Sequence, residues 1–314
     1  GAPRVNDLRS SGSSLPQTRL TLRFLLDTFV CMNPLQPLRN IAIIAHVDHG
    51  KTTLVDAILK ETGALRATEQ VTERLLDSNP LERERGITIL AKNTAVYYTA
   101  PATGLRYKIN IVDTPGHADF GGEVERILSM VDGALLLVDA AEGPLPQTRY
   151  VLSKALAANL APVVVVNKID RQDARPYEVA DEVLELFITL GASDEQLDFP
   201  ILYAAGRHGI VHPDLDAAKA ALREGGGSVL PLLDCIVEHV PPPTADAGDE
   251  GPVQFMVTML DYDDYVGRIA IGRVHRGTLR QGAIVAYGKP DAPVKRAKIV
   301  SLYTFERLAR LPAD

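Results

Sequence analysis

The chain has 314 residues, of which 46% are hydrophobic, and a formal net charge of -7 at pH 7. This length and apolar content are sufficient for about two globular domains with buried cores. The negative charge argues against a protein that coats nucleic acid non-specifically, because such binding depends on many Lys and Arg side chains, and we expect no DNA partner. Cys31 and Cys235 lie far apart without metal-ligand spacing, so we expect neither a disulfide framework nor a zinc site.

The first 31 residues are rich in Ser and Arg and poor in acidic side chains, with a short apolar patch between Leu20 and Val30. This composition fits either an organellar transit peptide or sequence upstream of a natural start at Met32, and we favour the second. We therefore expect residues 1–37 to be disordered and the protein to be cytoplasmic, with an organelle as the alternative location. No apolar run approaches the length of a transmembrane helix, so we expect no membrane partner.

Residues 40–53 predict a strand, a phosphate-binding loop and the start of a helix that continues over 54–60. Backbone N–H groups of such a loop and of the helix start converge on a nucleotide phosphate. Gly50 allows close approach of the backbone, Lys51 reaches the β- and γ-phosphates, and the Thr52 hydroxyl binds the bridging Mg²⁺. An ordinary βα turn is the alternative for this loop taken alone. The residues assigned here to phosphate binding are Asp48, His49, Gly50, Lys51, Thr52 and Thr53.

A long polar loop follows, and near its end Thr88 is placed to meet Mg²⁺ and the γ-phosphate. A strand over residues 107–112 then delivers Asp113 and Gly116 at its carboxyl end, where ligands of open α/β sheets bind. We expect Asp113 to hold the metal, through a water, and the Gly116 N–H to face a γ-phosphate oxygen. Loss of that phosphate would release Thr88 and Gly116, so the two loops form a nucleotide-dependent pair.

Two further apolar runs, 134–138 and 162–166, predict buried parallel strands, and the second ends at Asn167, Lys168 and Asp170. The Asp170 carboxylate would accept hydrogen bonds from the N1–H and the exocyclic amine of guanine, which adenine does not offer. Asn167 would brace the loops, and the stem of Lys168 would cover one face of the base. This pattern predicts specificity for guanine nucleotides.

A further strand over 199–205 leads into a last base-contacting loop at Ala205 and Gly206, where the Gly206 N–H would meet the guanine oxygen. The intervening stretches 144–160 and 177–190 have helical character, and 231–240 predicts a closing helix.

Residues 241–252, rich in Pro, Asp and Gly, predict a linker between domain 38–240 and domain 253–314. Beyond it the hydrophobic period changes to two, which predicts antiparallel strands. The expected strands cover 254–262, 268–276, 282–287 and 294–305. The predicted fold is a doubly wound, mostly parallel α/β domain of the P-loop GTPase type followed by a partial antiparallel β-barrel, and we expect the chain to be a fragment.

Taken in order, these motifs resemble the five nucleotide motifs of regulatory GTPases, and the strings 46–52, 85–89 and 113–117 resemble those of translational GTPases. Longer strings are similar to the TypA/BipA family. They lie at 76–95, 119–126, 144–149 and 194–200, so the resemblance runs from about residue 38 to residue 314.

The resemblance implies a Mg²⁺-dependent GTPase with GTP as substrate and GDP as product. It implies that His117 orients the attacking water, while Val47 and Ile87 form an apolar gate that holds the histidine away. It also implies a ribosomal partner, through ribosomal RNA near the GTPase-activating region, and a role in ribosome assembly or stress adaptation. We expect a monomer. Ala205 stands where the family commonly has Ser, and Gly206 where it has Ala.

Three alternatives remain at this stage. The first is an ATPase or kinase on the same loop, against which residues 167–170 argue. The second is a nucleotide-gated ribosome-binding scaffold with little turnover. The third is another translational GTPase, similar to LepA or to an elongation factor.

Overall fold

The structure is a computed structural model, and it describes residues 23–27, 37–64, 92–114, 121–243, 251–263, 266–289, 293–307 and 309–313. The predictions for Ile87, Thr88, Gly116 and His117 lie outside these residues. Among the helices described, none is both long and apolar enough to cross a membrane.

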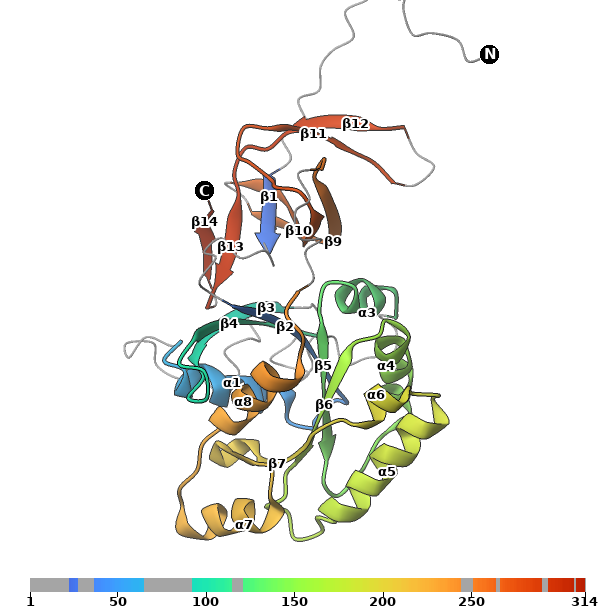
Figure 1. Cartoon of the computed structure of the whole chain (residues 1–314), viewed down its shortest axis with the longest axis vertical. Coiled ribbons are helices and arrows are strands. Elements are labelled where there is room, and N and C mark those ends of the chain that lie inside the picture. Colours follow the sequence, from blue (N-terminus) through green and yellow to red (C-terminus); the bar gives the residue numbers. More distant parts are fainter. Residues whose placement is uncertain are drawn as a thin grey trace, which may run out of the picture.

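A mostly parallel sheet of seven strands forms the larger part of the molecule (Figure 1). The strand order is β3-β4-β2-β5-β6-β7-β8, and only the two outermost pairs, β3 with β4 and β7 with β8, are antiparallel. The strands are β2 (Leu38–Ala45), β3 (Lys92–Thr99), β4 (Arg106–Asp113), β5 (Gly133–Asp139), β6 (Ala161–Asn167), β7 (Ile201–Ala205) and β8 (Ile210–His212). The strand predicted at the start of 40–53 and those predicted at 107–112, 134–138, 162–166 and 199–205 are confirmed to within a few residues.

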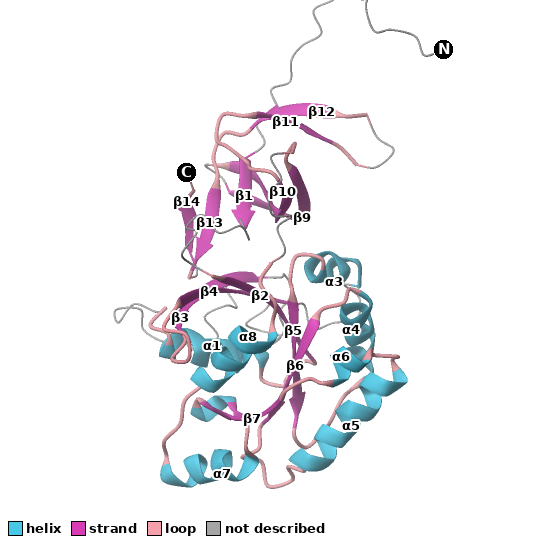
Figure 2. Cartoon of the chain, in the orientation of Figure 1, coloured by secondary structure: helices cyan, strands magenta, loops and turns pink. Residues whose placement is uncertain are grey.

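Helices cover both faces of this sheet, as Figure 2 shows. One apolar core contains residues of α1 and α8, and the other contains residues of α3, α4, α5 and α7. The helices are α1 (Lys51–Glu61), α3 (Gly121–Leu128), α4 (Pro146–Ala157), α5 (Pro176–Thr189), α6 (Asp194–Leu197), α7 (Leu215–Glu224) and α8 (Leu230–His239). Strands buried on both faces explain why β5 and β6 read as continuous apolar runs.

The order of the strands reverses at β2. After β2 the chain forms β3 and β4 on one side of it, and it then returns to form β5 on the other side. In open α/β sheets such a switch point leaves a crevice at the carboxyl ends of the strands, where ligands bind. The loop after β2 lies at this crevice, together with the ends of β4, β5 and β6.

The residues after 251 form antiparallel hairpins rather than one continuous sheet. β9 (Gln254–Asp263) pairs with β10 (Gly267–Arg276), β11 (Ile284–Tyr287) with β12 (Lys295–Lys298), and β13 (Tyr303–Glu306) with β14 (Ala309–Pro312). The prediction of one strand over 294–305 is wrong, because β12 and β13 belong to different hairpins. Ile299 and Leu302, which separate them, are instead buried in the small core of this region.

The segment at Arg23–Asp27 forms β1, which pairs in parallel with β10. The prediction of disorder across 1–37 is therefore wrong for these five residues. The sequence Phe24-Leu25-Leu26 is apolar, as strands require, and β10 offers an open edge because β9 occupies only its other side. A local pattern could not reveal a partner nearly 250 positions away.

A buried polar chain joins β10 to the large sheet. Arg273 donates to Met130 O at 3.1 Å and to Asp132 Oδ1 at 2.9 Å. The other carboxylate oxygen of Asp132 accepts from Asn40 Nδ2 at 2.7 Å, and Asn40 Oδ1 accepts from Asn110 at 2.9 Å. The hairpin region is thus hydrogen-bonded to β2 and β4, the strands that lead to the crevice.

Candidate nucleotide-binding site

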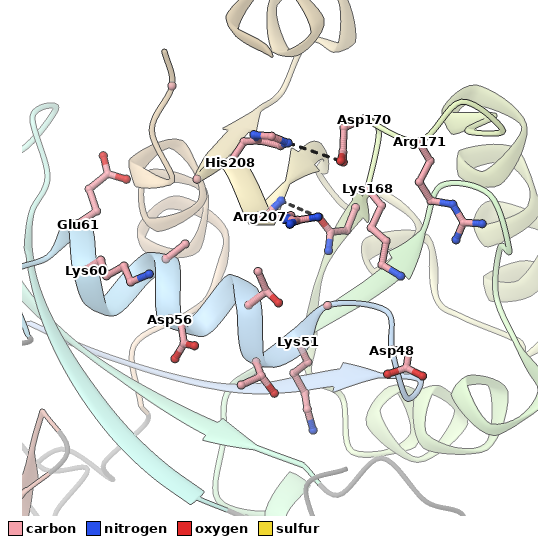
Figure 3. A pocket seen from close by; sticks show the side chains of 18 of the residues that line it. Asp48, Lys51, Asp56, Lys60, Glu61, Lys168, Asp170, Arg171, Arg207 and His208 are labelled. Atoms are coloured by element: carbon pink, nitrogen blue, oxygen red, sulfur yellow. Dashed lines mark hydrogen bonds and ion pairs between the residues drawn. The ribbon is translucent and has the colours of Figure 1, made fainter. Parts of the chain in front are cut away.

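A cavity of about 1010 Å³ lies at the crevice, between the loop after β2, helix α1 and the loops after β6 and β7 (Figure 3). Its lining is mostly polar and combines cationic, anionic and glycine residues. The lining includes His46, Val47, Asp48, Gly50, Lys51, Thr52, Thr53, Asn167, Lys168, Asp170, Arg171, Gly206, Arg207 and His208. The cavity therefore gathers most of the phosphate and base residues that the sequence predicts.

The loop after β2 turns sharply into α1. Gly50 has φ +95° and directly precedes Lys51, the first residue of the helix. A Cβ on Gly50 would lie 2.5 Å from Asn167 Nδ2, so both the backbone conformation and the space require glycine here. Asp48 also has a positive φ, 65°, which is costly for a residue with a side chain and persists where the surroundings hold it.

Lys51 and Asp113 form a buried ion pair beside this loop. Lys51 Nζ lies 2.7 Å from Asp113 Oδ1, and the same ammonium donates to Thr114 O. The Thr114 hydroxyl in turn donates to Ile43 O at 2.6 Å, which fastens the end of β4 to β2. The predicted phosphate ligand and the predicted metal ligand therefore lie together at adjacent strand ends.

Asn167 connects the two sides of the cavity. Its Nδ2 donates to His49 O at 2.9 Å, and its Oδ1 accepts from the Gly206 N–H at 3.0 Å. The predicted bracing role of Asn167 matches these contacts. The Asn167 side chain accepts the Gly206 N–H here, and the predicted contact of this N–H with the guanine oxygen stays a prediction.

Asp139, which was not predicted from the sequence, forms an ion pair with Lys168. Its carboxylate is fully buried at the end of β5, 2.8 Å from Lys168 Nζ and 3.1 Å from Arg171, and it accepts from the Ala141 N–H at 2.7 Å. Burial alone would raise the pKa of Asp139, but the hydrogen bonds from Lys168 and Ala141, with the charge of Arg171, hold the pKa below its usual value. An Asp that ends a buried strand before a loop is the only local signal for this residue.

Asp170, the predicted guanine ligand, borders the cavity with 31% of its side chain exposed. His208, also missed from sequence, places its Nε2 3.7 Å from Asp170 Oδ2 (Figure 3). His208 belongs to a short 3₁₀ turn, Gly206–His208. Ala205 is fully buried in the core, so only Gly206 of the predicted pair lines the cavity.

His49 contributes its backbone rather than its side chain to this region. The ring is 1% exposed, with Nδ1 3.4 Å from Leu137 O and Nε2 3.6 Å from Glu142. Burial lowers the pKa of His49, the Leu137 carbonyl opposes this shift, and the nearby His46 adds to it. The ring therefore favours the neutral form and packs edge-on against His46, with 5.3 Å between the ring centroids.

Known proteins match most of the sequence of this chain. The family model of the elongation factor Tu GTP binding domain matches residues 36–242. Proteins named large ribosomal subunit assembly factor BipA are 57% identical over 277 residues in Bacillus subtilis strain 168 and 54% identical over 275 residues in Synechocystis. The alignments cover 88% of this chain but 43% and 44% of those proteins, so the chain spans less than half of their length.

A relative of the same name in Salmonella typhimurium is 50% identical over 280 residues, which are 89% of this chain and 44% of that protein. The crystal structure of a Thermus thermophilus protein shares the fold, with a TM-score of 0.62 and 22% identity over 88% of this chain and 50% of that one. These findings confirm the resemblance to the TypA/BipA family. The chain belongs to the family of the elongation factor Tu GTP-binding domain.

Proposed function

We propose that this chain binds GTP together with Mg²⁺ and hydrolyses it to GDP and phosphate. The observation that carries the proposal is the double contact of Asn167, which ties the phosphate loop at His49 to the base loop at Gly206 around one cavity. One end of the cavity has the Lys51 ammonium and the start of a helix, and the other has the Asp170 carboxylate. A nucleotide site needs both a cationic end, which binds the phosphates, and an end with hydrogen-bonding groups for the base.

Recognition at the two ends follows from charge and hydrogen bonding. The free N–H groups at the start of α1 and the point charge of Lys51 suit the β- and γ-phosphates. Asp170 presents two acceptor oxygens to guanine, with the stem of Lys168 beside them. Adenine would leave the carboxylate without its donors, which makes the site selective for guanine.

Thr52, Asp113 and Thr88 are the residues that we propose as metal ligands. The Thr52 hydroxyl and the Asp113 carboxylate offer oxygen donors, which are the ligands that Mg²⁺ prefers, so the residues that the structure describes fit this ion. When bound, Mg²⁺ would neutralise charge on the β- and γ-phosphates. Lys51, now paired with Asp113, would turn to the phosphates as the carboxylate turns to the metal.

Hydrolysis requires a residue that orients water, and we propose His117 for this role, with Gly116 as a donor to the γ-phosphate. Val47, which lines the cavity, would form an apolar gate with Ile87. Phosphoryl transfer depends on positioning and charge stabilisation. With no arginine assigned to the transition state, we expect slow intrinsic turnover that a partner accelerates.

The partner that we propose is the ribosome. The BipA relatives are named as assembly factors of the large ribosomal subunit, and their identity to this chain reaches 57%. We further propose contact with ribosomal RNA, a monomeric state and a cytoplasmic location. Residues 38–240 would form the nucleotide domain, and 253–314 would form part of a second domain that takes part in docking.

The experiment is single-turnover hydrolysis of γ-labelled GTP, with and without ribosomes, by this chain and by a BipA-length protein that contains it. The proposal predicts slow release of phosphate that ribosomes accelerate in the longer protein, and loss of that acceleration in His117→Ala. Tight GTP binding with no phosphate release under any of these conditions would instead support a nucleotide-gated scaffold.

A further inference from the structure

The contacts of Lys168 and Arg171 with a buried carboxylate point to a positioning residue that the proposed function does not include. Asp139 is fully buried, whereas Lys168 and Arg171, which contact it, both line the cavity. A carboxylate without access to water is unfavourable unless cations and hydrogen-bond donors surround it. The buried charge of Asp139 is therefore stabilised by these two side chains, and the carboxylate in turn holds both cations in position.

Of the two cations, Lys168 depends more strongly on Asp139 for its position. Its backbone adopts φ +61°, a left-handed conformation that a residue with a side chain keeps only when its surroundings enforce it. Its ammonium lies 2.8 Å from Asp139 Oδ2. Arg171 also donates to Asp173 at 2.9 and 2.8 Å, so a second carboxylate holds the guanidinium in place.

The backbone next to Asp139 is hydrogen-bonded to the end of β6 and to the segment that follows it. The Ala140 N–H donates to Asn167 O at 2.7 Å, and the Arg175 N–H donates to Ala140 O at 2.8 Å. Glu142, three residues after Asp139, lies 3.6 Å from His49 Nε2 in the phosphate loop and 3.5 Å from Arg171. The loop after β5 thus contacts both the loop after β6 and the phosphate loop.

We propose that Asp139 positions Lys168 for guanine binding, without contacting the nucleotide itself. By accepting from the Lys168 ammonium, the carboxylate holds the lysine stem along the wall of the base pocket. The stem is then already in place when the base arrives, so binding does not have to order a long flexible side chain. This inference rests on the proposed guanine-nucleotide site and names a residue that sets how long the nucleotide stays.

The test is the dissociation rate of a fluorescent GDP analogue chased with excess GDP. We expect Asp139→Asn, which keeps the shape and an acceptor for Ala141 but removes the charge, to speed dissociation about three- to tenfold. Lys168→Ala should speed it by a similar factor. In the double variant the Asp139 change should add less than about twofold, because the two residues act through one contact.

Two controls separate positioning from general loosening. Asp132→Asn makes the same chemical change just before the opposite end of β5, where the carboxylate pairs with Arg273, and it should lower stability without altering the dissociation rate. Arg171→Ala tests the other cation, and Asp139→Asn should keep its full effect in that background.

The outcomes are distinct. Full additivity of Asp139→Asn and Lys168→Ala, or an equal change in Asp132→Asn, would overturn the inference while leaving the nucleotide site intact. If the unaltered chain fails to bind the GDP analogue, the proposed function itself fails and the positioning role falls with it.

Discussion

Lys51 Nζ lies 2.7 Å from Asp113 Oδ1, and only 8% and 2% of the two side chains are exposed. A pair this well buried is strongly destabilised when one partner is removed, because the other is left as an uncompensated charge. The same two groups are those proposed to meet the phosphates and the metal. The pair therefore has a structural role in the chain alone, and the proposed function gives it a second role in binding the nucleotide.

Lys51→Ala should weaken GTP binding by at least about tenfold, because the phosphates lose their buried point charge, and should lower the free energy of unfolding by about 3 kcal/mol. Calorimetric titration and urea unfolding measure the two effects. Lys154→Ala, which breaks an exposed pair with Glu125, serves as the control and should change neither quantity. Unaltered GTP affinity in Lys51→Ala would remove this residue from the site.

Asn167→Ala should lower nucleotide affinity more than tenfold and stability by about 2–3 kcal/mol, because His49 O and the Gly206 N–H lose a buried partner. Asn110→Ala removes another buried amide, which donates to Asn40 away from the cavity. That control should cost about 1–2 kcal/mol with unchanged affinity. Equal loss of affinity in both variants would mean that Asn167 acts only through overall stability.

Arg273→Ala should reduce stability by about 3 kcal/mol, because Asp132 keeps a mostly buried charge without its partner. The hairpin region should then unfold before the large sheet, giving two transitions in a calorimetric scan. Arg310→Ala breaks the ion pair with Asp261, in which both side chains are about a third or more exposed, and should cost less than about 1 kcal/mol. A single unshifted transition in Arg273→Ala would show that this contact does not join the two parts.

The buried His49 ring predicts a pH dependence of stability. Its pKa is lowered in the folded chain, so the unfolded chain takes up a proton first as the pH falls below about 6.5. The stability contribution is therefore present at neutral pH and is lost on acidification. Urea unfolding at pH 7.5 and 5.5 should show a smaller difference in His49→Gln than in the unaltered chain.

The parts of the site that lie within contiguous motifs could be predicted from sequence. Gly50, Lys51 and Thr52 lie within one loop, and residues 167–170 directly follow an apolar run, so spacing alone puts them at strand ends. Their meeting across the cavity follows from the parallel sheet, since neighbouring parallel strands end at the same edge.

The contacts that sequence reasoning missed are long-range. Asp139 gains its role only because Lys168, 29 positions later, adopts a positive φ beside it. The Arg273–Asp132 pair joins residues 141 positions apart, and no local hydrophobic pattern predicts it. β1 was mistaken for disorder because its partner β10 lies near the other end of the chain. The hydrogen bond from the Gly206 N–H to Asn167 could not be predicted either, because the two residues meet only when their loops are folded together.

Competition binding measures whether the cavity selects guanine over other bases. A fluorescent GDP analogue bound to this chain is displaced by GDP, by ADP, or by inosine diphosphate, which lacks the exocyclic amine. GDP should compete at least about a hundredfold better than ADP, with inosine diphosphate between them, because Asp170 would lose both donors with ADP and one donor with inosine diphosphate. Equal competition by ADP and GDP would contradict it.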